Sequence, residues 1–170
     1  MNCVRYALYL QLLTRRATIM PQSLVQIYLH IVFSTKDRRP FLRDPELRQK
    51  LYAYMAGTFQ GLGSPALKIG GVGDHVHALC RLSRTGSLSD LIRDLKRDTS
   101  KWVKEHGRGL DEFSWQLGYG AFSISPSHVG RLMEYIENQE EHHRTETFQD
   151  ELRRLLRTYE VEFDERYLWD

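Results

Sequence analysis

Hydrophobic and polar positions follow two periodicities along this chain, one typical of strands and the other typical of helices. Residues 25–35, VQIYLHIVFST, are rich in β-branched and aromatic side chains and predict a central strand. Residues 66–73 and 75–82 predict two further strands that are joined tightly, as in a hairpin. The segment 113–125, FSWQLGYGAFSIS, is aromatic and interrupted by glycines, and it predicts one or two more strands.

Helical spacing dominates the rest of the chain. In the clearest case, Leu91, Ile92 and Leu95 begin an apolar stripe that a capping box of Ser87 and Asp90 precedes. The same periodicity, with start and stop signals, predicts helices over residues 45–63, 87–107, 125–143 and 147–159.

The predicted order is therefore β-α-β-β-α-β followed by extra helices. This order is typical of an α+β, ferredoxin-like (RRM-like) fold, an antiparallel sheet with helices on one face, here with C-terminal helices added. We expect one domain over residues 20–170 and treat residues 1–19 as an extension outside the fold. The same architecture carries proteins that read single-stranded RNA, so the fold alone does not select a function.

Composition narrows the setting but not the activity. The net charge is +2 over 170 residues, and residues 1–19 contribute three arginines and no acid, so the remainder is close to neutral. Nucleic-acid binding would therefore need local basic patches. Two cysteines are too few for a disulfide framework, and we expect a reducing, cytoplasmic setting. The first apolar run is short and contains Gln11, so no membrane contact is expected.

Two histidines stand out in GDHVHAL, residues 73–79. Because alternate residues of a strand share a face, His75 and His77 point the same way and Val76 points to the other side. Such a pair is a ready platform for a metal ion, which binds neutral imidazole. Considered alone, however, the pair is better explained by hydrogen-bonded core or surface histidines.

A second constellation lies on the predicted helix 125–143. On a helical projection Val129 and Ile136 belong to the apolar stripe, while Tyr135, Gln139 and His142 follow one border of it. Tyr135 and Gln139 are four residues apart and hence neighbours on a half-buried edge. One interpretation is an ordinary amphipathic rim, and the other is a phenol held beside a metal ligand.

The combination of GDHVHAL, SWQLGYGAFSIS and YIENQ resembles the single-tyrosine HUH transposases of bacterial insertion sequences, the IS200-like family. The similarity extends over nearly everything from Met20 onward, including LVQIYLHIVFSTKDRRPFL near the start and NQEEHHRTETFQDEL near the end. All three segments together are far more specific than any one of them.

The resemblance implies roles for named residues. His75, His77 and Gln139 would bind a divalent metal ion, Mg²⁺ or Mn²⁺, although histidine ligands also suit zinc. Tyr135 would be the nucleophile that attacks single-stranded DNA and forms a 5′-phosphotyrosine with a free 3′-OH. Family members act as homodimers on DNA hairpins, and the tyrosine helix can serve the partner's site. His142 and His143 could be additional ligands or DNA contacts.

Local basic patches offer candidate DNA contacts. Residues 84–108 hold seven basic side chains against four acids, and a second small patch follows the first strand. The candidates are Lys36, Arg38, Arg39, Arg93, Lys96, Arg97, Lys101 and Lys104. A solvated helix face is the alternative for each of them.

The resemblance predicts a DNA transposase, and three rivals remain open. One is a domesticated relative that nicks hairpins without moving an element. Another is a non-catalytic module that binds single-stranded nucleic acid. The third is a metal-dependent hydrolase in which water, and not Tyr135, attacks the phosphate.

Overall fold

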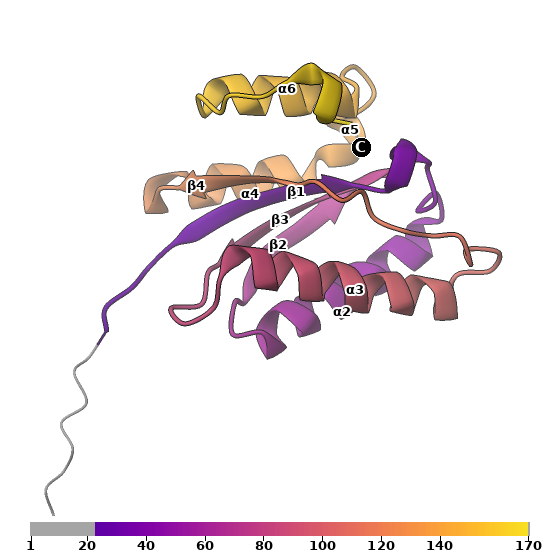
Figure 1. The fold of residues 1–170 in the computed structure, drawn as a ribbon, viewed down its shortest axis with the longest axis horizontal. Helices are drawn as coiled ribbons and strands as arrows, with labels where there is room; N and C mark the ends of the chain where they lie inside the picture. The colour runs from indigo at the N-terminus through magenta and orange to yellow at the C-terminus, as the bar shows by residue number, and fades with distance from the viewer. Residues whose placement is uncertain (1–22, 170) are drawn as a thin grey trace, which may run out of the picture.

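The computed structural model describes residues 23–169; residues 1–22 and 170 lie outside the description, and with them the predicted extension at residues 1–19. Over the described residues, four strands form one antiparallel sheet in the order β2-β3-β1-β4 (Figure 1). The elements in chain order are β1 (Tyr28–Ser34), α2 (Pro45–Gly61), β2 (Ala66–Gly71), β3 (His75–Arg81), α3 (Leu88–His106), β4 (Gly120–Ile124), α4 (Val129–Glu137), α5 (Gln139–His142) and α6 (Phe148–Thr158).

The connectivity confirms the predicted fold class. From β1 to β4 the elements follow β-α-β-β-α-β, and the sheet has the strand order of a split βαβ unit. The predicted helix starts are also present: Asp44 caps α2, with its side chain accepting from Glu46 N at 2.9 Å, and Ser87 caps α3, accepting from Asp90 N at 3.1 Å.

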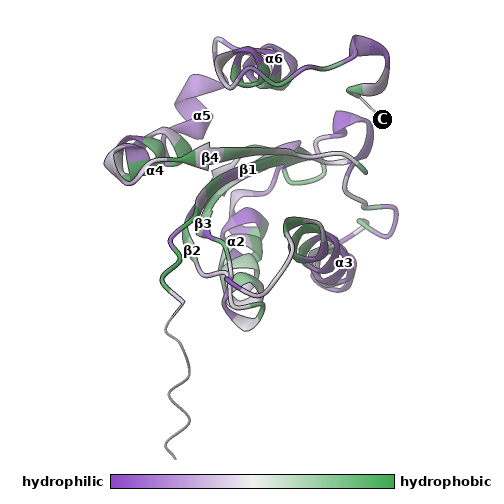
Figure 2. Ribbon diagram, turned by 60° about the vertical axis from the view of Figure 1, so that its left-hand side comes forward, coloured by the Kyte–Doolittle hydropathy of each residue, from purple (hydrophilic) through white to green (hydrophobic). Residues whose placement is uncertain are grey.

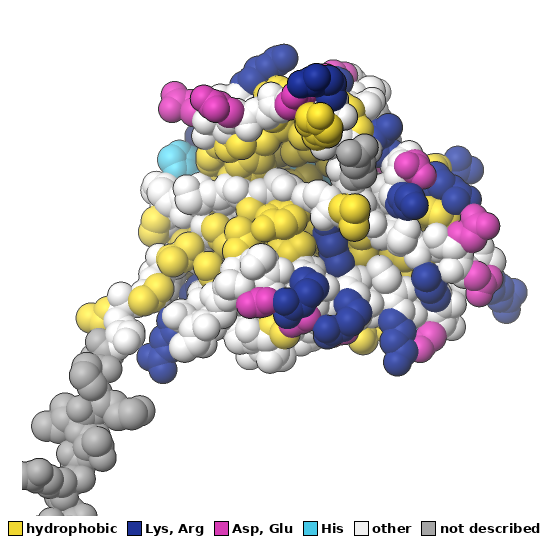
Figure 3. Space-filling model, viewed as in Figure 1, with side chains coloured by type: hydrophobic (Ala, Val, Ile, Leu, Met, Phe, Trp, Pro, Cys, Tyr) yellow, Lys and Arg dark blue, Asp and Glu magenta, His cyan; other side chains and the backbone are white. Residues whose placement is uncertain are grey.

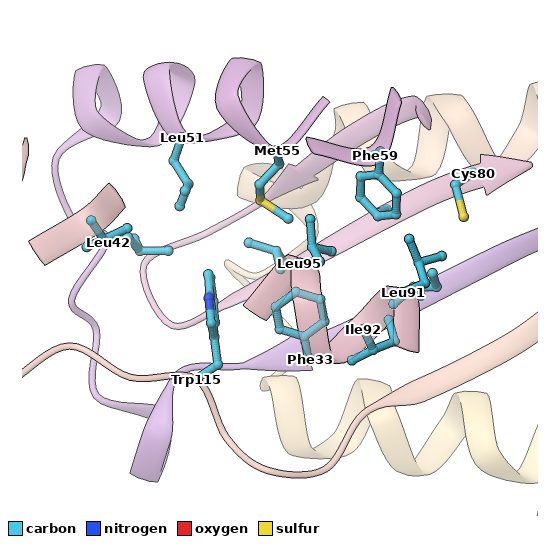
Figure 4. Close-up of a cluster of buried hydrophobic side chains, with 14 of the residues drawn as sticks. Phe33, Leu42, Leu51, Met55, Phe59, Cys80, Leu91, Ile92, Leu95 and Trp115 are labelled. Carbon is cyan, nitrogen blue, oxygen red and sulfur yellow. The ribbon is translucent and has the colours of Figure 1, made fainter. Parts of the chain in front are cut away.

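Helices α2 and α3 cover one face of the sheet and form the main hydrophobic core with it (Figure 4). Leu51, Met55 and Phe59 of α2 and Leu91 and Leu95 of α3 point into this core. The strand residues that meet them alternate along β1 and β3: Leu29, Ile31, Phe33, Val76, Ala78 and Cys80. This face is apolar, as the pattern of a half-buried strand requires.

The opposite face is covered by the C-terminal helices, so the sheet lies between two helical layers (Figure 2). Helix α4 packs on β2 and β3, and Ile136 contacts Leu79 there. Helix α6 packs its Leu152 against Val32 and Phe122 of the sheet. None of the described helices has the length and apolar composition that crossing a bilayer requires.

One predicted strand segment is shorter than its sequence suggests. Of residues 113–125, the structure assigns Gly120–Ile124 to a strand, β4. Before it, Phe113 and Trp115 enter the main core from an irregular segment. The ammonium of Lys96 accounts for this: it donates to the backbone oxygens of residues 116, 117 and 118 at 2.8, 3.2 and 2.7 Å, and so satisfies carbonyls that no strand covers.

Candidate metal centre and its tyrosine

His75 and His77 lie on the face of β3 that α4 and α6 cover, side by side and fully buried. Their alternation with Val76, which lies in the main core, confirms the predicted shared face. The two rings have their centroids 5.1 Å apart. The rigid sheet thus presents two imidazoles to one enclosed space.

Each of these rings is oriented by a partner at its Nδ1 atom. Asp74 Oδ1 lies 2.7 Å from His75 Nδ1, and His30 Nε2, on the adjacent strand β1, lies 2.9 Å from His77 Nδ1. Both Nε2 atoms are thereby turned into the site, and within residues 23–169 neither has a hydrogen-bond partner. Such outer partners fix the tautomer and the aim of metal-binding histidines. Sequence analysis did not single out His30, although its spacing from Val32 places it on the same face of β1, opposite the main core.

A glycine lets the tyrosine helix approach the histidines. Gly70 of β2 pairs with His77 of β3, and α4 packs directly on it. A Cβ built on Gly70 would lie 2.4 Å from the backbone oxygen of Ile136 and 2.9 Å from its Cγ2 atom. Only glycine permits this approach without movement. Tyr135 and Gln139 lie close to Ile136 in the chain, so the approach also brings them to the His77 side of the sheet.

The segment that carries Tyr135 and Gln139 is not the continuous helix predicted over 125–143. A 3-10 turn precedes α4, and the chain leaves helical geometry at Asn138 before α5 begins. The Asn138 side chain donates to the backbone oxygen of Glu134 at 2.9 Å and so satisfies a carbonyl at the end of α4. Tyr135 and Gln139 nevertheless reach the same group, the carboxylate of Glu151.

Glu151 of α6 is the centre of the site, and sequence analysis missed it. Its side chain is fully buried. Oε1 accepts hydrogen bonds from the Tyr135 hydroxyl and from Gln139 Nε2, the latter at 3.2 Å. Oε2 lies 3.3 Å from His77 Nε2 and 3.6 Å from His75 Nε2. A signal existed: Glu151 occupies the apolar stripe of a strongly amphipathic helix.

The two histidines predicted as additional ligands differ in position. His143 joins the cluster, with Nε2 3.1 Å from Glu151 Oε2 and Nδ1 2.8 Å from the backbone oxygen of Glu146. His142 lies outside it, between Glu146 and Arg154, with its ring centroid 5.2 Å from that of Tyr135.

Burial and proximity determine which groups are charged. Burial lowers the pKa of His77 to about 4 and that of His30 to about 3, so both rings are neutral at pH 7. Burial opposes ionisation of Glu151 too, but His77 and His143 bring its pKa well below the usual range. Burial and the Glu151 charge raise the pKa of Tyr135 above its ordinary value, against the effect of Arg154, whose Nη2 lies 3.2 Å from the phenol oxygen.

The side chains present fit a metal ion. When Nδ1 of His75 donates to Asp74 and Nδ1 of His143 donates to Glu146, the Nε2 atoms carry lone pairs, and both face an ionised carboxylate. Gln139 Oε1 is buried and has no hydrogen-bond partner among the described residues. Four potential ligand atoms, from His75, His77, His143 and Glu151, lie within 4.8 Å of one another. Acceptors that converge in this way are suited to hold a cation between them.

The basic residues predicted to contact DNA form two groups, which lie at different distances from the histidine cluster. Those of α3 are on the far side of the sheet, interleaved with acids (Figure 3). Arg93 and Arg97 pair with Asp94 at 3.1 and 2.8 Å. Exposed Lys101 and Lys104 lie further along the helix. Lys96 is used inside the fold, over the Phe33 ring, and burial lowers its pKa to about 8.

The patch after β1 is closer to the histidines. Thr35 N donates to the backbone oxygen of Asp74 at 2.7 Å, so the turn that follows lies at the His75 end of the sheet. In this turn Lys36 is exposed, Arg38 stacks on Trp169 at 5.4 Å, and Arg39 pairs with Glu112 at 3.0 Å. A DNA role for these residues stays a prediction.

The fold and the cluster together define a class: an open antiparallel sheet that presents a pair of strand histidines to a helix bearing a tyrosine and a glutamine. A family model described as "Transposase IS200 like" matches residues 23–139. The chain therefore belongs to the IS200-like transposase family, which confirms the resemblance. Its match ends at Gln139, so His143 and Glu151 lie beyond the matched segment.

Solved structures share the fold. A candidate transposase from Deinococcus radiodurans R1 is 20% identical with a TM-score of 0.58, and the similarity covers 71% of this chain and 95% of that one. A REP-associated tyrosine transposase bound to a REP hairpin is 15% identical with a TM-score of 0.54, covering 73% of each chain. A search of curated proteins found no match.

Proposed function

We propose that this transposase cleaves and rejoins single-stranded DNA through a 5′-phosphotyrosine at Tyr135, assisted by a divalent metal ion, Mg²⁺ or Mn²⁺. The observation that carries the proposal is the meeting of Tyr135, Gln139, His75 and His77 around one buried carboxylate, Glu151. Family membership supports the reaction class. DNA hairpins are the proposed recognition element, since one structural relative is bound to a hairpin.

The chain's own groups can be assigned to the steps of a transesterification. The Tyr135 oxygen attacks the phosphorus of a phosphodiester, the bond from phosphorus to the 3′-oxygen breaks, and the phenol proton ends on that leaving 3′-oxygen. Glu151 Oε1 holds the phenol by its proton, and Arg154 Nη2, 3.2 Å from the oxygen, favours the charge that develops there. The phosphotyrosine bond retains the energy of the phosphodiester, so rejoining needs no external energy source.

His75, His77 and Gln139 are the proposed metal ligands. Their free acceptors are the buried Nε2 and Oε1 atoms that lack hydrogen-bond partners within the described chain. When bound, the metal ion supplies Lewis-acid polarisation of the scissile phosphate and stabilises the leaving oxygen. These three ligands are neutral, so they do not themselves reduce the charge of the ion.

We further propose that Tyr135 acts on the metal site of its own chain. Its hydroxyl donates to Glu151, which contacts His75 and His77 of that same chain. A homodimer on paired hairpins remains part of the proposal, but the chemistry at one site does not depend on a partner's tyrosine.

The experiment is a covalent-trapping assay. Wild-type protein is incubated with end-labelled single-stranded DNA that carries a hairpin, with Mn²⁺ or EDTA, and is then resolved in SDS. We expect an adduct with Mn²⁺ that is absent with EDTA and absent in Tyr135→Phe. Tyr159→Phe is the matched control, because Tyr159 stacks on Phe122 away from the cluster and should leave the adduct unchanged.

Two outcomes would reject the assignment. If the wild type forms no adduct on any hairpin substrate, the covalent mechanism is wrong. If Tyr135→Phe still cleaves the DNA, water is the nucleophile and the protein is a hydrolase. His75→Ala should abolish cleavage and leave DNA affinity within about twofold, since the buried imidazole serves the metal and not the DNA surface.

A further inference from the structure

We propose that Glu151 joins the metal site to the nucleophile, with Oε2 as a metal ligand beside His75 and His77 and Oε1 as the acceptor that holds the Tyr135 hydroxyl. The inference rests on the proposed function and goes beyond it by adding a residue from α6, outside the segment that the family model matches. The same carboxylate would then both bind the metal ion and position the tyrosine.

The position of Oε2 suits a ligand. Atoms bound at about 2.1 Å to one ion lie about 3.0 to 3.4 Å apart when they are adjacent in its coordination shell. Oε2 lies 3.1 Å from His143 Nε2, 3.3 Å from His77 Nε2 and 3.6 Å from His75 Nε2. The distances from Oε2 to the three nitrogens are therefore close to those expected between ligand atoms that share one ion.

The position of Oε1 suits an anchor. It accepts from the Tyr135 hydroxyl and, at 3.2 Å, from Gln139 Nε2. The two oxygens of Glu151 thus face different sets of partners, and the side chain is fully buried, so its carboxylate cannot rotate without breaking one set. Gln139 is held by the same contact, through its amide nitrogen.

The cost of burying Glu151 argues for a ligand at this position. Phe148, Leu152 and Leu155 continue the same stripe of α6, and an apolar residue would fit there by pattern. A buried carboxylate is strongly unfavourable unless cations or several donors compensate it. Tyr135 and Gln139 supply donors to Oε1, whereas Oε2 has one hydrogen-bond partner, His143 Nε2, and also faces the Nε2 atoms of His75 and His77, which have none among the described residues.

The first test measures metal affinity without DNA. Mn²⁺ binding to the full chain is followed by electron paramagnetic resonance for wild type, Glu151→Gln and Tyr135→Phe. We expect Glu151→Gln to bind Mn²⁺ at least about tenfold more weakly and Tyr135→Phe to bind within about twofold of wild type. Glu134→Gln is the matched control, since Glu134 is an exposed carboxylate beside Tyr135.

Two results would overturn the ligand role. One is wild-type Mn²⁺ affinity in Glu151→Gln while His77→Ala loses binding, which would keep the metal site and remove Glu151 from it. The other is a wild type that does not bind Mn²⁺ at millimolar concentration. Both results leave the tyrosine assignment to be judged by covalent trapping alone.

The second test addresses the anchor at saturating Mn²⁺, with thermal unfolding to show that each variant is folded. Glu151→Gln keeps an oxygen that can accept from Tyr135, and Glu151→Ala does not. We expect the rate of adduct formation to fall about tenfold in Glu151→Gln and at least about a hundredfold in Glu151→Ala. Equal rates for Glu151→Ala and wild type would overturn the anchor role. If Glu151→Ala does not fold, Glu151→Leu also removes the acceptor and suits the apolar stripe of α6, and a wild-type rate in that variant overturns the anchor role.

Discussion

The two faces of the sheet are built from the same strands but bury different kinds of side chain, apolar on one face and polar at the centre of the other. On the α2–α3 face, Ile31, Phe33 and Val76 belong to the main hydrophobic core. On the α4–α6 face, one residue along in each strand, His75 and His77 face a buried carboxylate and His30 contacts His77. Alternation along a strand thus separates the part that stabilises the fold from the part that we propose does the chemistry.

The difference lies in how each face satisfies its groups. The apolar face gains free energy from burial and close packing, and beside it only the Tyr52 hydroxyl lacks a hydrogen-bond partner within residues 23–169. The polar face buries imidazole and amide acceptors that lack partners within residues 23–169. Such a face costs stability, which is the expected property of a site that a ligand completes. Mutations on the two faces should therefore have different consequences.

The largest effect on stability should come from the apolar face. Phe33 is buried and packs edge-on against Trp115 at 4.8 Å. Phe33→Ala should lower the free energy of unfolding by about 3–5 kcal/mol in urea denaturation. His77→Ala, in metal-free protein, should cost at most about half as much, because a neutral ring with an unpaired Nε2 loses little. Equal losses would show that the two faces contribute alike.

The next largest effect should come from the contact between helix α4 and strand β2. In Gly70→Ala the new methyl group would meet the backbone of Ile136 and move α4 away from β2. A shift of about 1 Å at Tyr135 should reduce adduct formation about a hundredfold. Gly57→Ala is the control, because a Cβ there meets nothing within 4 Å. An unchanged rate in Gly70→Ala would mean that α4 is free to adjust.

Metal binding should partly remove the cost of the polar face. At about 30 times its dissociation constant, Mn²⁺ should stabilise the wild type by about 2 kcal/mol and raise the midpoint of thermal unfolding by about 4–8 °C. His75→Ala should show no shift, and Phe33→Ala should keep it despite its lower midpoint. A shift that survives in His75→Ala would place the ion elsewhere.

The smallest effect should come from the outer surface of α3. Arg93 and Arg97 already pair with acids and lie on the side of the sheet away from the cluster. The double variant Arg93→Gln/Arg97→Gln should weaken hairpin binding less than about threefold at 0.15 M salt. A much larger loss, with a reduced salt slope, would assign the hairpin to α3 and restore the prediction from the basic pattern.

The sequence predicts much of this arrangement because local patterns determine it. Strand alternation places His75 beside His77, and the four-residue spacing places Tyr135 beside Gln139, although the helix breaks at Asn138. Glu151 could not be linked to them by spacing, because its contact depends on how α6 folds back over the sheet. The role of Lys96 as a DNA contact stays a prediction, and charge alone did not reveal that its ammonium binds three backbone carbonyls.

The most direct test of the account is to map the covalent adduct. The protein, trapped on hairpin DNA with Mn²⁺, is digested with trypsin and nuclease, and the modified peptide is identified by mass spectrometry. The chain has nine tyrosines, so the position is informative. The account predicts a nucleotide joined through its 5′-phosphate to Tyr135. A phosphotyrosine at any other position would contradict it, as would DNA cleavage with no modified peptide.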